Sequence, residues 1–156
     1  MTITIRPATL SDVPSLEIIR RQAIEDAYSS VYERSRFADL VAGADTNLPR
    51  EIERESSIAL VAESPITQLA YVVCDRDQGE LLSLYTAPDY QGRGYATDLL
   101  RTVENSLPGR GTSRISVWSP TATTSFFRDN GYESLDGYRE DPVPRIRLTK
   151  PLSQTG

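Results

Sequence analysis

One stretch decides the fold of this chain: Ala87-Pro88-Asp89-Tyr90-Gln91-Gly92-Arg93-Gly94-Tyr95-Ala96-Thr97-Asp98-Leu99-Leu100. It follows an apolar run at residues 81–86 and leads into a helix with apolar residues at spacings i, i+3, i+4, i+7 and i+11. Two glycines and an arginine stand between strand and helix. Free backbone N–H groups at the positive end of a helix dipole bind phosphate. The stretch therefore predicts a phosphate site at residues 91–97.

Length and composition fit one globular domain. The chain has 156 residues, of which 38% are hydrophobic, so we expect a single domain at residues 1–150 and a flexible tail at 151–156. The net charge of −5, from 22 acidic and 17 basic residues, disfavours a nucleic-acid partner. No apolar run approaches the ~20 residues of a membrane span, so we expect a soluble cytoplasmic protein with no membrane partner. The sequence leaves open whether the protein forms a homodimer.

Two absences exclude whole classes of site. The chain has no histidine, which rules out Ser-His-Asp hydrolysis and any histidine-ligated zinc site. It has one cysteine, Cys74, so a disulfide within the chain and a thiolate metal cluster are excluded too. Cys74 stands in an apolar run and is expected to be a buried small hydrophobe. We predict no metal site.

The first half of the chain predicts one helix and a series of strands. Residues 2–5 alternate as a strand, and Ser11 or Asp12 caps a helix that carries apolar residues to Ala27. Between residues 32 and 55 the pattern is patchy. It suggests a short helix near 37–41, a loop at 43–47 and a helical turn at 49–55. Three strands then follow at hairpin spacing, at residues 57–63, 67–75 and 80–86.

The second half alternates helices with strands. The helix after the glycines ends at Pro108-Gly109, and a strand follows at residues 114–118. Ser119 is expected to cap the next helix with Pro120 at its first position, and Asn130-Gly131 to end it. Two last strands are predicted at residues 132–138 and 143–149. The order predicts an α/β fold with a mixed, mostly antiparallel twisted sheet and helices on both faces.

Several phosphate sites compete for the glycine stretch. A nucleoside-triphosphate loop needs a lysine and a hydroxyl residue after its last glycine, but Gly94 is followed by Tyr95-Ala96. A dinucleotide fingerprint would place Thr97 where its third glycine belongs, and the acidic residue expected ~20 positions later is missing. An ordinary strand-to-helix turn explains the glycines but not the residues around them.

The stretch closely resembles the coenzyme A pyrophosphate loop of the GNAT superfamily of N-acetyltransferases. The family pattern, Gln/Arg-x-x-Gly-x-Gly/Ala, is met by Gln91, Gly94 and Ala96, with Pro-Asp-Tyr just before it. The opening strand that ends in Arg6-Pro7-Ala8 is similar to the family too. So is Phe126-Phe127-Arg128-Asp129-Asn130-Gly131-Tyr132. The resemblance implies a GNAT-like domain, with a bulged strand before the loop that splays from its parallel neighbour.

That resemblance also implies the donor and the reaction. The donor would be acetyl-CoA, whose acetyl group passes by direct transfer to a primary amine of a small molecule, peptide or protein. The acceptor would lie over residues 28–55 and the loops after Tyr132. The coenzyme would contact the end of the strand, the loop and one aromatic residue of the later helix: Leu84, Tyr85, Thr86, Gln91, Gly92, Arg93, Gly94, Tyr95, Ala96, Thr97 and Phe127.

The resemblance also suggests catalytic residues. Glu80 opens the strand where some family members place a general base. The usual general acid is a tyrosine at the position of Phe127, which has no proton to give. Tyr132 and Tyr138 are the candidate replacements. The alternatives are an unaided thiolate leaving group, a non-catalytic acyl-CoA-binding or regulatory module, and a nicotinamide-dinucleotide binder.

Overall fold

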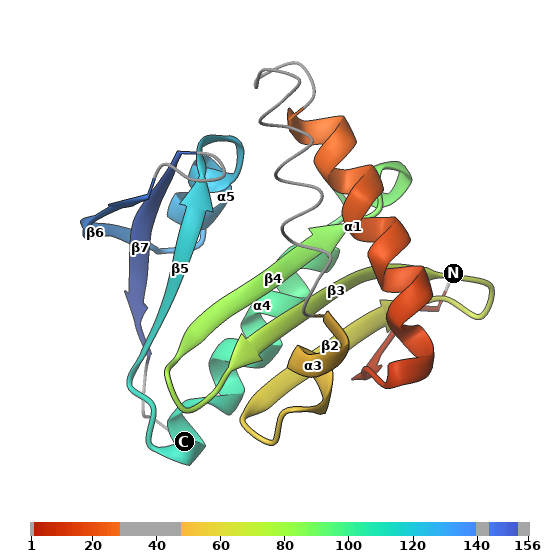
Figure 1. Ribbon diagram of the computed structural model, residues 1–156, viewed down its shortest axis with the longest axis horizontal. Coiled ribbons are helices and arrows are strands. Elements are labelled where there is room, and N and C mark those ends of the chain that lie inside the picture. The colour runs from red at the N-terminus through yellow and green to blue at the C-terminus, as the bar shows by residue number, and fades with distance from the viewer. Residues whose placement is uncertain (1, 29–47, 140–143, 153–156) are drawn as a thin grey trace.

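The computed structural model describes residues 2–28, 48–139 and 144–152. Their strands form one seven-stranded sheet in the order β1-β2-β3-β4-β5-β7-β6. The predicted mixed α/β fold is confirmed (Figure 1). The elements are β1 (Thr4–Pro7), α1 (Val13–Tyr28), α3 (Leu48–Glu53), β2 (Ser57–Glu63), β3 (Gln68–Asp75), β4 (Glu80–Thr86), α4 (Tyr95–Ser106), β5 (Arg114–Pro120), α5 (Thr121–Asp129), β6 (Glu133–Arg139) and β7 (Arg145–Pro151), with short 3-10 turns at Leu10–Asp12, Pro88–Tyr90 and Pro108–Arg110.

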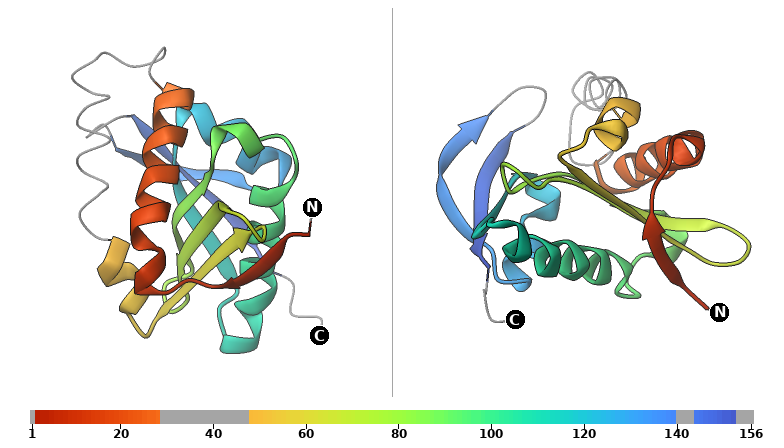
Figure 2. Two further views of the ribbon diagram at one scale, coloured as in Figure 1. Left: turned by 90° about the vertical axis from the view of Figure 1, so that its right-hand side faces the viewer. Right: turned by 90° about the horizontal axis from the view of Figure 1, so that it is seen from below.

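Helices cover both faces of the sheet, as the element order predicts. Strand β3 separates two cores, because its side chains alternate between the faces. Val72 and Cys74 belong to the cluster that α4 and α5 cover. Tyr71 and Val73 belong to the cluster under α1 and α3. The right-hand view of Figure 2 shows α1 and α3 on one side of the sheet and α4 on the other.

The only parallel pair among the described strands, β4 with β5, separates soon after it begins. The pairing holds at two positions, where Glu80 faces Ser116 and Leu81 faces Val117. Against β3 the register of β4 shifts by one residue at Leu82, because Val73 pairs with Ser83 and Cys74 with Leu81. Such a bulge bends a strand. Beyond it β4 and β5 diverge, which confirms the predicted splayed pair (Figure 1).

The start of α5 differs from the predicted one. Ser119 and Pro120 still belong to β5, where they pair with Ile146 and Arg145 of β7. Pro120 is then the N-cap residue, with φ −62° and ψ 159°. A residue before proline is kept out of the helical region by steric contact with the ring, so Ser119 stays extended. The predicted end of this helix at Asn130-Gly131 is confirmed, since Gly131 has φ +94°.

The first and last strands of the chain each lie two residues beyond their predicted positions. Strand β1 spans Thr4–Pro7, and Pro7 is tolerated there because β1 is an edge strand. Strand β7 includes Pro151, and the N–H of Leu152 donates to the carbonyl of Ser113 at 2.8 Å. The short helix and the loop predicted at residues 37–47 lie outside the described residues.

A buried carboxylate fastens the first strand to the first helix. Asp12 is 4% exposed and accepts two hydrogen bonds from the Arg6 guanidinium, at 2.9 and 2.8 Å. It also accepts one from the N–H of Thr9 at 2.7 Å and one from the Gln68 amide. The hydrogen bonds from Arg6 hold the pKa of Asp12 well below its usual range. This contribution to stability is present at neutral pH and is lost as the pH falls through the folded-state pKa.

Replacement of Asp12 by alanine is expected to lower the free energy of unfolding by about 2–3 kcal/mol at pH 7, because it removes two hydrogen bonds of Arg6, which keeps only Glu63 as a carboxylate partner among the described residues, and leaves the Thr9 amide without its acceptor. Urea denaturation measures the change. Asp77→Ala is the control, since the Asp77 side chain is 71% exposed, and it should change stability by less than about 0.5 kcal/mol. Equal urea midpoints for the two variants at pH 7 would refute the role given to Asp12.

Candidate active site

The glycine stretch forms an anion-binding turn. Gly92 and Gly94 have φ of +76° and +87°, which L-residues other than glycine rarely adopt. Gly94 is the N-cap of α4 and provides no side-chain cap. The first four N–H groups of a helix have no partner within it, and here they belong to Gly94, Tyr95, Ala96 and Thr97. The turn therefore presents a row of donors at the positive end of the helix dipole.

A pocket of about 530 Å³ opens in front of these donors. Its walls are the end of β4, the turn, the start of α4, and one face of α5, with Ala23 of α1. Every residue predicted to contact the coenzyme lines it except Arg93. The lining residues are Ala23, Leu84, Tyr85, Thr86, Tyr90, Gln91, Gly92, Gly94, Tyr95, Ala96, Thr97, Thr123, Phe126 and Phe127.

Two side chains of the turn make contacts that shape it. Gln91 donates from its amide to the carbonyl of Thr86 at 3.3 Å and so fastens the turn to the end of β4. The Arg93 guanidinium lies over the ring of Tyr90, with its Cζ 5.5 Å from the ring centroid. Arg93 is exposed and directed at Tyr90, which explains its absence from the pocket wall.

A second pocket of about 220 Å³ continues along the gap between β4 and β5. Four residues belong to both pockets: Leu84, Tyr85, Thr123 and Phe127. The rest of the second pocket is formed by the earlier part of β4, by β5, and by arginines of β6 and β7. Those residues are Glu80, Leu81, Leu82, Ser83, Val117, Trp118, Pro120, Arg139 and Arg145. The two pockets thus form a path whose midpoint is the diverging edge of β4.

Glu80 lies in the wall of the second pocket, within a tight ion pair. Both of its carboxylate oxygens accept hydrogen bonds from the Arg147 guanidinium, at 2.7 and 2.6 Å. Charge-assisted hydrogen bonds of this bidentate kind are among the strongest in proteins. The Arg147 Cζ lies 4.9 Å from the centroid of the Trp118 ring. The arrangement suits Glu80 to holding Arg147 in place better than to accepting a proton.

Neither tyrosine predicted as a general acid lies in the two pockets. Tyr132 is 2% exposed and donates its hydroxyl hydrogen bond to Glu104 of α4 at 2.8 Å. Burial, and then the Glu104 charge, raise the pKa of Tyr132 well above its usual range. Its ring packs edge-on against Phe127 in the core. Tyr138 is 63% exposed on β6. The structure therefore brings neither tyrosine to the two pockets.

Thr123 is the hydroxyl that the sequence reasoning missed. It lines both pockets and stands four residues before Phe127, so the two side chains share one face of α5. Its Oγ1 lies 3.0 Å from Ser119 Oγ and donates to the carbonyl of Pro120 at 3.2 Å. The helical spacing from Phe127 was the signal that could have pointed to it.

Cys74 is confirmed as a buried hydrophobe. It is 0% exposed, and burial, with smaller effects of Asp75 and Glu80, raises the pKa of its thiol to about 12. A thiol in this state is a poor nucleophile. The chain has no other cysteine.

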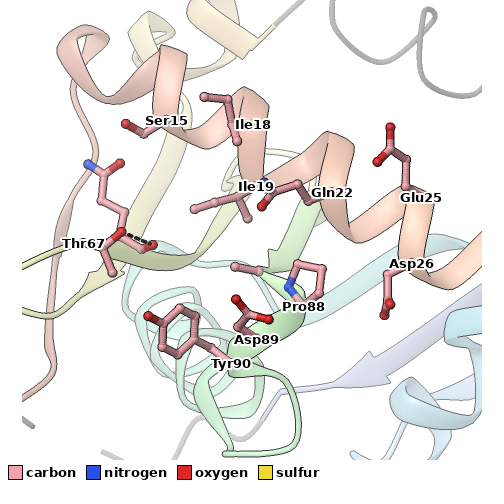
Figure 3. A pocket seen from close by; sticks show the side chains of 12 residues that line it. Ser15, Ile18, Ile19, Gln22, Glu25, Asp26, Thr67, Pro88, Asp89 and Tyr90 are labelled. Carbon is pink, nitrogen blue, oxygen red and sulfur yellow. Dashed lines mark hydrogen bonds between the residues drawn. The ribbon is translucent and has the colours of Figure 1, made fainter.

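A third pocket, of about 680 Å³, lies on the α1 side of the sheet and is acidic (Figure 3). Glu25 and Asp26 extend from α1, and Asp89 comes from the 3-10 turn before the glycines. Its lining includes no residue of β4 or α5, and Tyr90 alone is shared with the pocket at the glycine turn. An acceptor bound there would not touch the diverging edge of β4.

Two further findings concern the part of the chain that the structure describes. No group of three or more acidic, cysteine or histidine side chains is placed to hold a metal ion there. None of the helices described has both the length and the apolar character that crossing a membrane requires.

Comparison with known families gives one match. Residues 21–132 match the model of the Acetyltransferase (GNAT) family. These residues make up more than two thirds of the chain and include the glycine turn and the aromatic pair of α5. No curated protein matches the chain.

Solved structures with the same fold cover nearly the whole chain. The PaiA N-acetyltransferase from Thermoplasma acidophilum, in complex with coenzyme A, superposes with a TM-score of 0.83 at 20% identity, over 97% of this chain and 99% of that one. A GCN5-related N-acetyltransferase from Rhodopseudomonas palustris gives 0.84 at 21% identity, over 97% of each chain. An aminoglycoside 6'-N-acetyltransferase complexed with coenzyme A gives 0.67 at 14% identity, over 100% of this chain and 99% of that one.

Proposed function

The chain belongs to the acetyltransferase (GNAT) family, and we propose that it passes the acetyl group of acetyl-CoA directly to a primary amine. Membership makes it an acyltransferase with acetyl-CoA as the donor. One observation supports the finer proposal. Two pockets meet at Leu84, Tyr85, Thr123 and Phe127, one reaching the glycine turn and the other reaching the arginines of β6 and β7. Donor and acceptor can therefore meet at the edge of β4 from different ends of one path.

The residues of the first pocket fit the donor. The free amides at Gly94–Thr97 suit a pyrophosphate, because they supply donors and the positive helix end together. Beyond Leu81, β4 no longer pairs with β5, so its main chain offers N–H and C=O groups to an extended ligand arm. Phe126 and Phe127 form an apolar wall for that arm. The donor supplies an activated acyl group, a thioester.

The chain's own groups would then stabilise charge near the meeting point. A main-chain N–H of the unpaired β4 edge is suited to donate to the thioester carbonyl, where negative charge develops. The amine must lose a proton to attack, and with Glu80 engaged by Arg147 we assign that proton to water in the second pocket. The Thr123 hydroxyl, which donates to the Pro120 carbonyl in the structure, would turn from that carbonyl to hydrogen-bond the departing sulfur.

Thr123→Val is expected to lower kcat about ten-fold, because it removes one hydrogen bond to developing charge and keeps the shape of the side chain. The KM for acetyl-CoA should stay within about three-fold of the original value. Thr102→Val is the matched control, since the Thr102 hydroxyl only donates to Asp98 within α4. Steady-state rates of thiol release measure both variants. An unchanged kcat in Thr123→Val would remove Thr123 from the mechanism.

The direct test of the proposed function is the release of free coenzyme A thiol from acetyl-CoA in the presence of a panel of amines. We expect thiol release that depends on the amine, together with an amine product whose mass has risen by one acetyl group. Tight binding of coenzyme A with no thiol release for any amine would instead identify a non-catalytic acyl-CoA-binding module. Stabilisation by a nicotinamide dinucleotide and none by coenzyme A would overturn both.

A further inference from the structure

The second pocket carries a local charge opposite to that of the whole chain. An open hollow of about 400 Å³ adjoins this pocket. The pocket and the hollow have four lining residues in common, Glu80, Leu82, Trp118 and Arg139, and the hollow is also lined by Arg147 and Asp75. The chain has a net charge of −5, which by itself would favour a cationic substrate. The residues around this pocket point the other way.

Both carboxylates that the described part of the chain places near this pocket have arginine partners. Glu80 is held by Arg147 through two hydrogen bonds, at 2.7 and 2.6 Å. Asp75 lies 3.7 Å from a guanidinium nitrogen of Arg54. Neither carboxylate therefore leaves a net negative charge to attract a cationic acceptor into the pocket.

Two arginines in the same pocket have no carboxylate partner among the described residues. The Arg145 Nε is buried and has no hydrogen-bond acceptor in the part of the chain that the structure describes. The Arg139 guanidinium stacks on the Trp118 ring, with its Cζ 4.1 Å from the ring centroid. A buried guanidinium N–H without an acceptor is a costly arrangement unless a ligand supplies one.

The strand register places these two positive charges opposite each other. Arg139 of β6 and Arg145 of β7 are directly paired across the antiparallel ladder, and both line the second pocket. Like charges at directly opposed positions destabilise a sheet. An anion bound between the two guanidinium groups would relieve their repulsion and supply a hydrogen-bond acceptor to Arg145 Nε. The planar fork of a guanidinium fits a carboxylate, which accepts two parallel hydrogen bonds.

We propose that the acceptor carries a carboxylate close to its amine, as a free amino acid does, and that Arg139 and Arg145 bind this carboxylate. This inference rests on the proposed function and names the class of its acceptor. With the carboxylate held at β6 and β7, the amine extends along the pocket toward Thr123 and Phe127, where the donor pocket begins. The acidic pocket of Figure 3 lies apart from this path and takes no part.

The test compares matched pairs of acceptors: alanine, leucine, phenylalanine and glutamate, each against its own α-carboxamide. Thiol release is followed for both members of each pair, and simple diamines serve as cationic acceptors. We expect the best amino acid to exceed its carboxamide in kcat/KM by at least about ten-fold. Equal or faster turnover of carboxamides or diamines would overturn the inference and leave the proposed function standing. No thiol release with any acceptor would overturn both.

Arginine variants connect the preference to the pocket. Arg145→Gln and Arg139→Gln should each raise the KM for the amino acid by about ten-fold, and leave the KM for the carboxamide and for acetyl-CoA nearly unchanged. Arg128→Gln is the matched control, because Arg128 is exposed, donates a hydrogen bond to the Ser134 hydroxyl and lines none of the pockets described. Melting temperatures should not fall in Arg145→Gln, since the change removes one of two opposed charges. An unchanged preference in both variants, or a raised KM for acetyl-CoA, would overturn the assignment.

Discussion

Ala96→Asp is expected to weaken the binding of coenzyme A by about 100-fold without destabilising the fold. Ala96 is the second residue of α4 and lines the donor pocket. A carboxylate at this position repels a pyrophosphate and occupies its amide donors. The same carboxylate interacts favourably with the helix dipole, so the free energy of unfolding should stay constant or rise by a few tenths of a kcal/mol. Affinity and stability thus change in opposite directions.

Titration calorimetry with coenzyme A measures this affinity, and urea denaturation measures the stability. Ala96→Asn is the control, because asparagine has nearly the shape of aspartate without its charge. The asparagine variant should bind at least about ten-fold more tightly than the aspartate variant. Equal affinities of the two variants would show that bulk alone acts at this position. An affinity of Ala96→Asp like that of the original chain would contradict the assignment of the turn.

Leu99→Ala is expected to lower the free energy of unfolding by about 3 kcal/mol. Leu99 is 0% exposed and packs in the core cluster between α4 and the sheet, together with Leu100 and Val103. Its truncation leaves a cavity beneath the helix that presents the amide donors. Stability falls because fewer methyl groups are buried on folding, and because the side chains that line the cavity attract one another less strongly across it.

Urea denaturation of Leu99→Ala gives the size of the effect. Ile66→Ala is its control, since Ile66 is 90% exposed at the turn between β2 and β3 and should change stability by less than about 0.5 kcal/mol. A decrease below about 1 kcal/mol in Leu99→Ala would mean that α4 is anchored by contacts other than this core.

Local patterns were enough to predict the glycine turn and the helix that follows it. The glycines at positions 92 and 94 are needed for backbone angles that a turn of this kind demands, and the apolar stripe of α4 fixes where the helix begins. The bounds of β2 and β4 agree with those predicted. Information of this kind lies within a few neighbouring residues, so a sequence shows it directly.

The proposed acceptor side depends on contacts between distant residues, which no local pattern shows. Glu80 meets Arg147 across 67 positions, and Tyr132 meets Glu104 across 28. Neither partner can be read from the local sequence around the residue that it meets. Arg139 and Arg145 come together only through the register of β6 on β7, which shifts between Leu135 and Tyr138. Composition gives only the net charge of the whole chain, which is negative, whereas the charge of this pocket is positive.

Among the described residues, neither pocket contains an activated nucleophile that could carry the acetyl group, and this favours direct transfer. Cys74 is buried with a raised thiol pKa, and the chain has no histidine to activate Ser83 or Thr123. An acyl group held covalently on the protein would need such a nucleophile. The proposed direct transfer requires donor and acceptor to be bound at the same time, and the residues that the two pockets share are where we propose that they meet.

Initial-velocity kinetics tests this claim most directly. Thiol release is measured while acetyl-CoA and an accepted amine are both varied. Simultaneous binding predicts double-reciprocal lines that intersect, because each substrate affects the slope for the other. Parallel lines, the mark of a ping-pong reaction through an acetylated protein, would contradict the account.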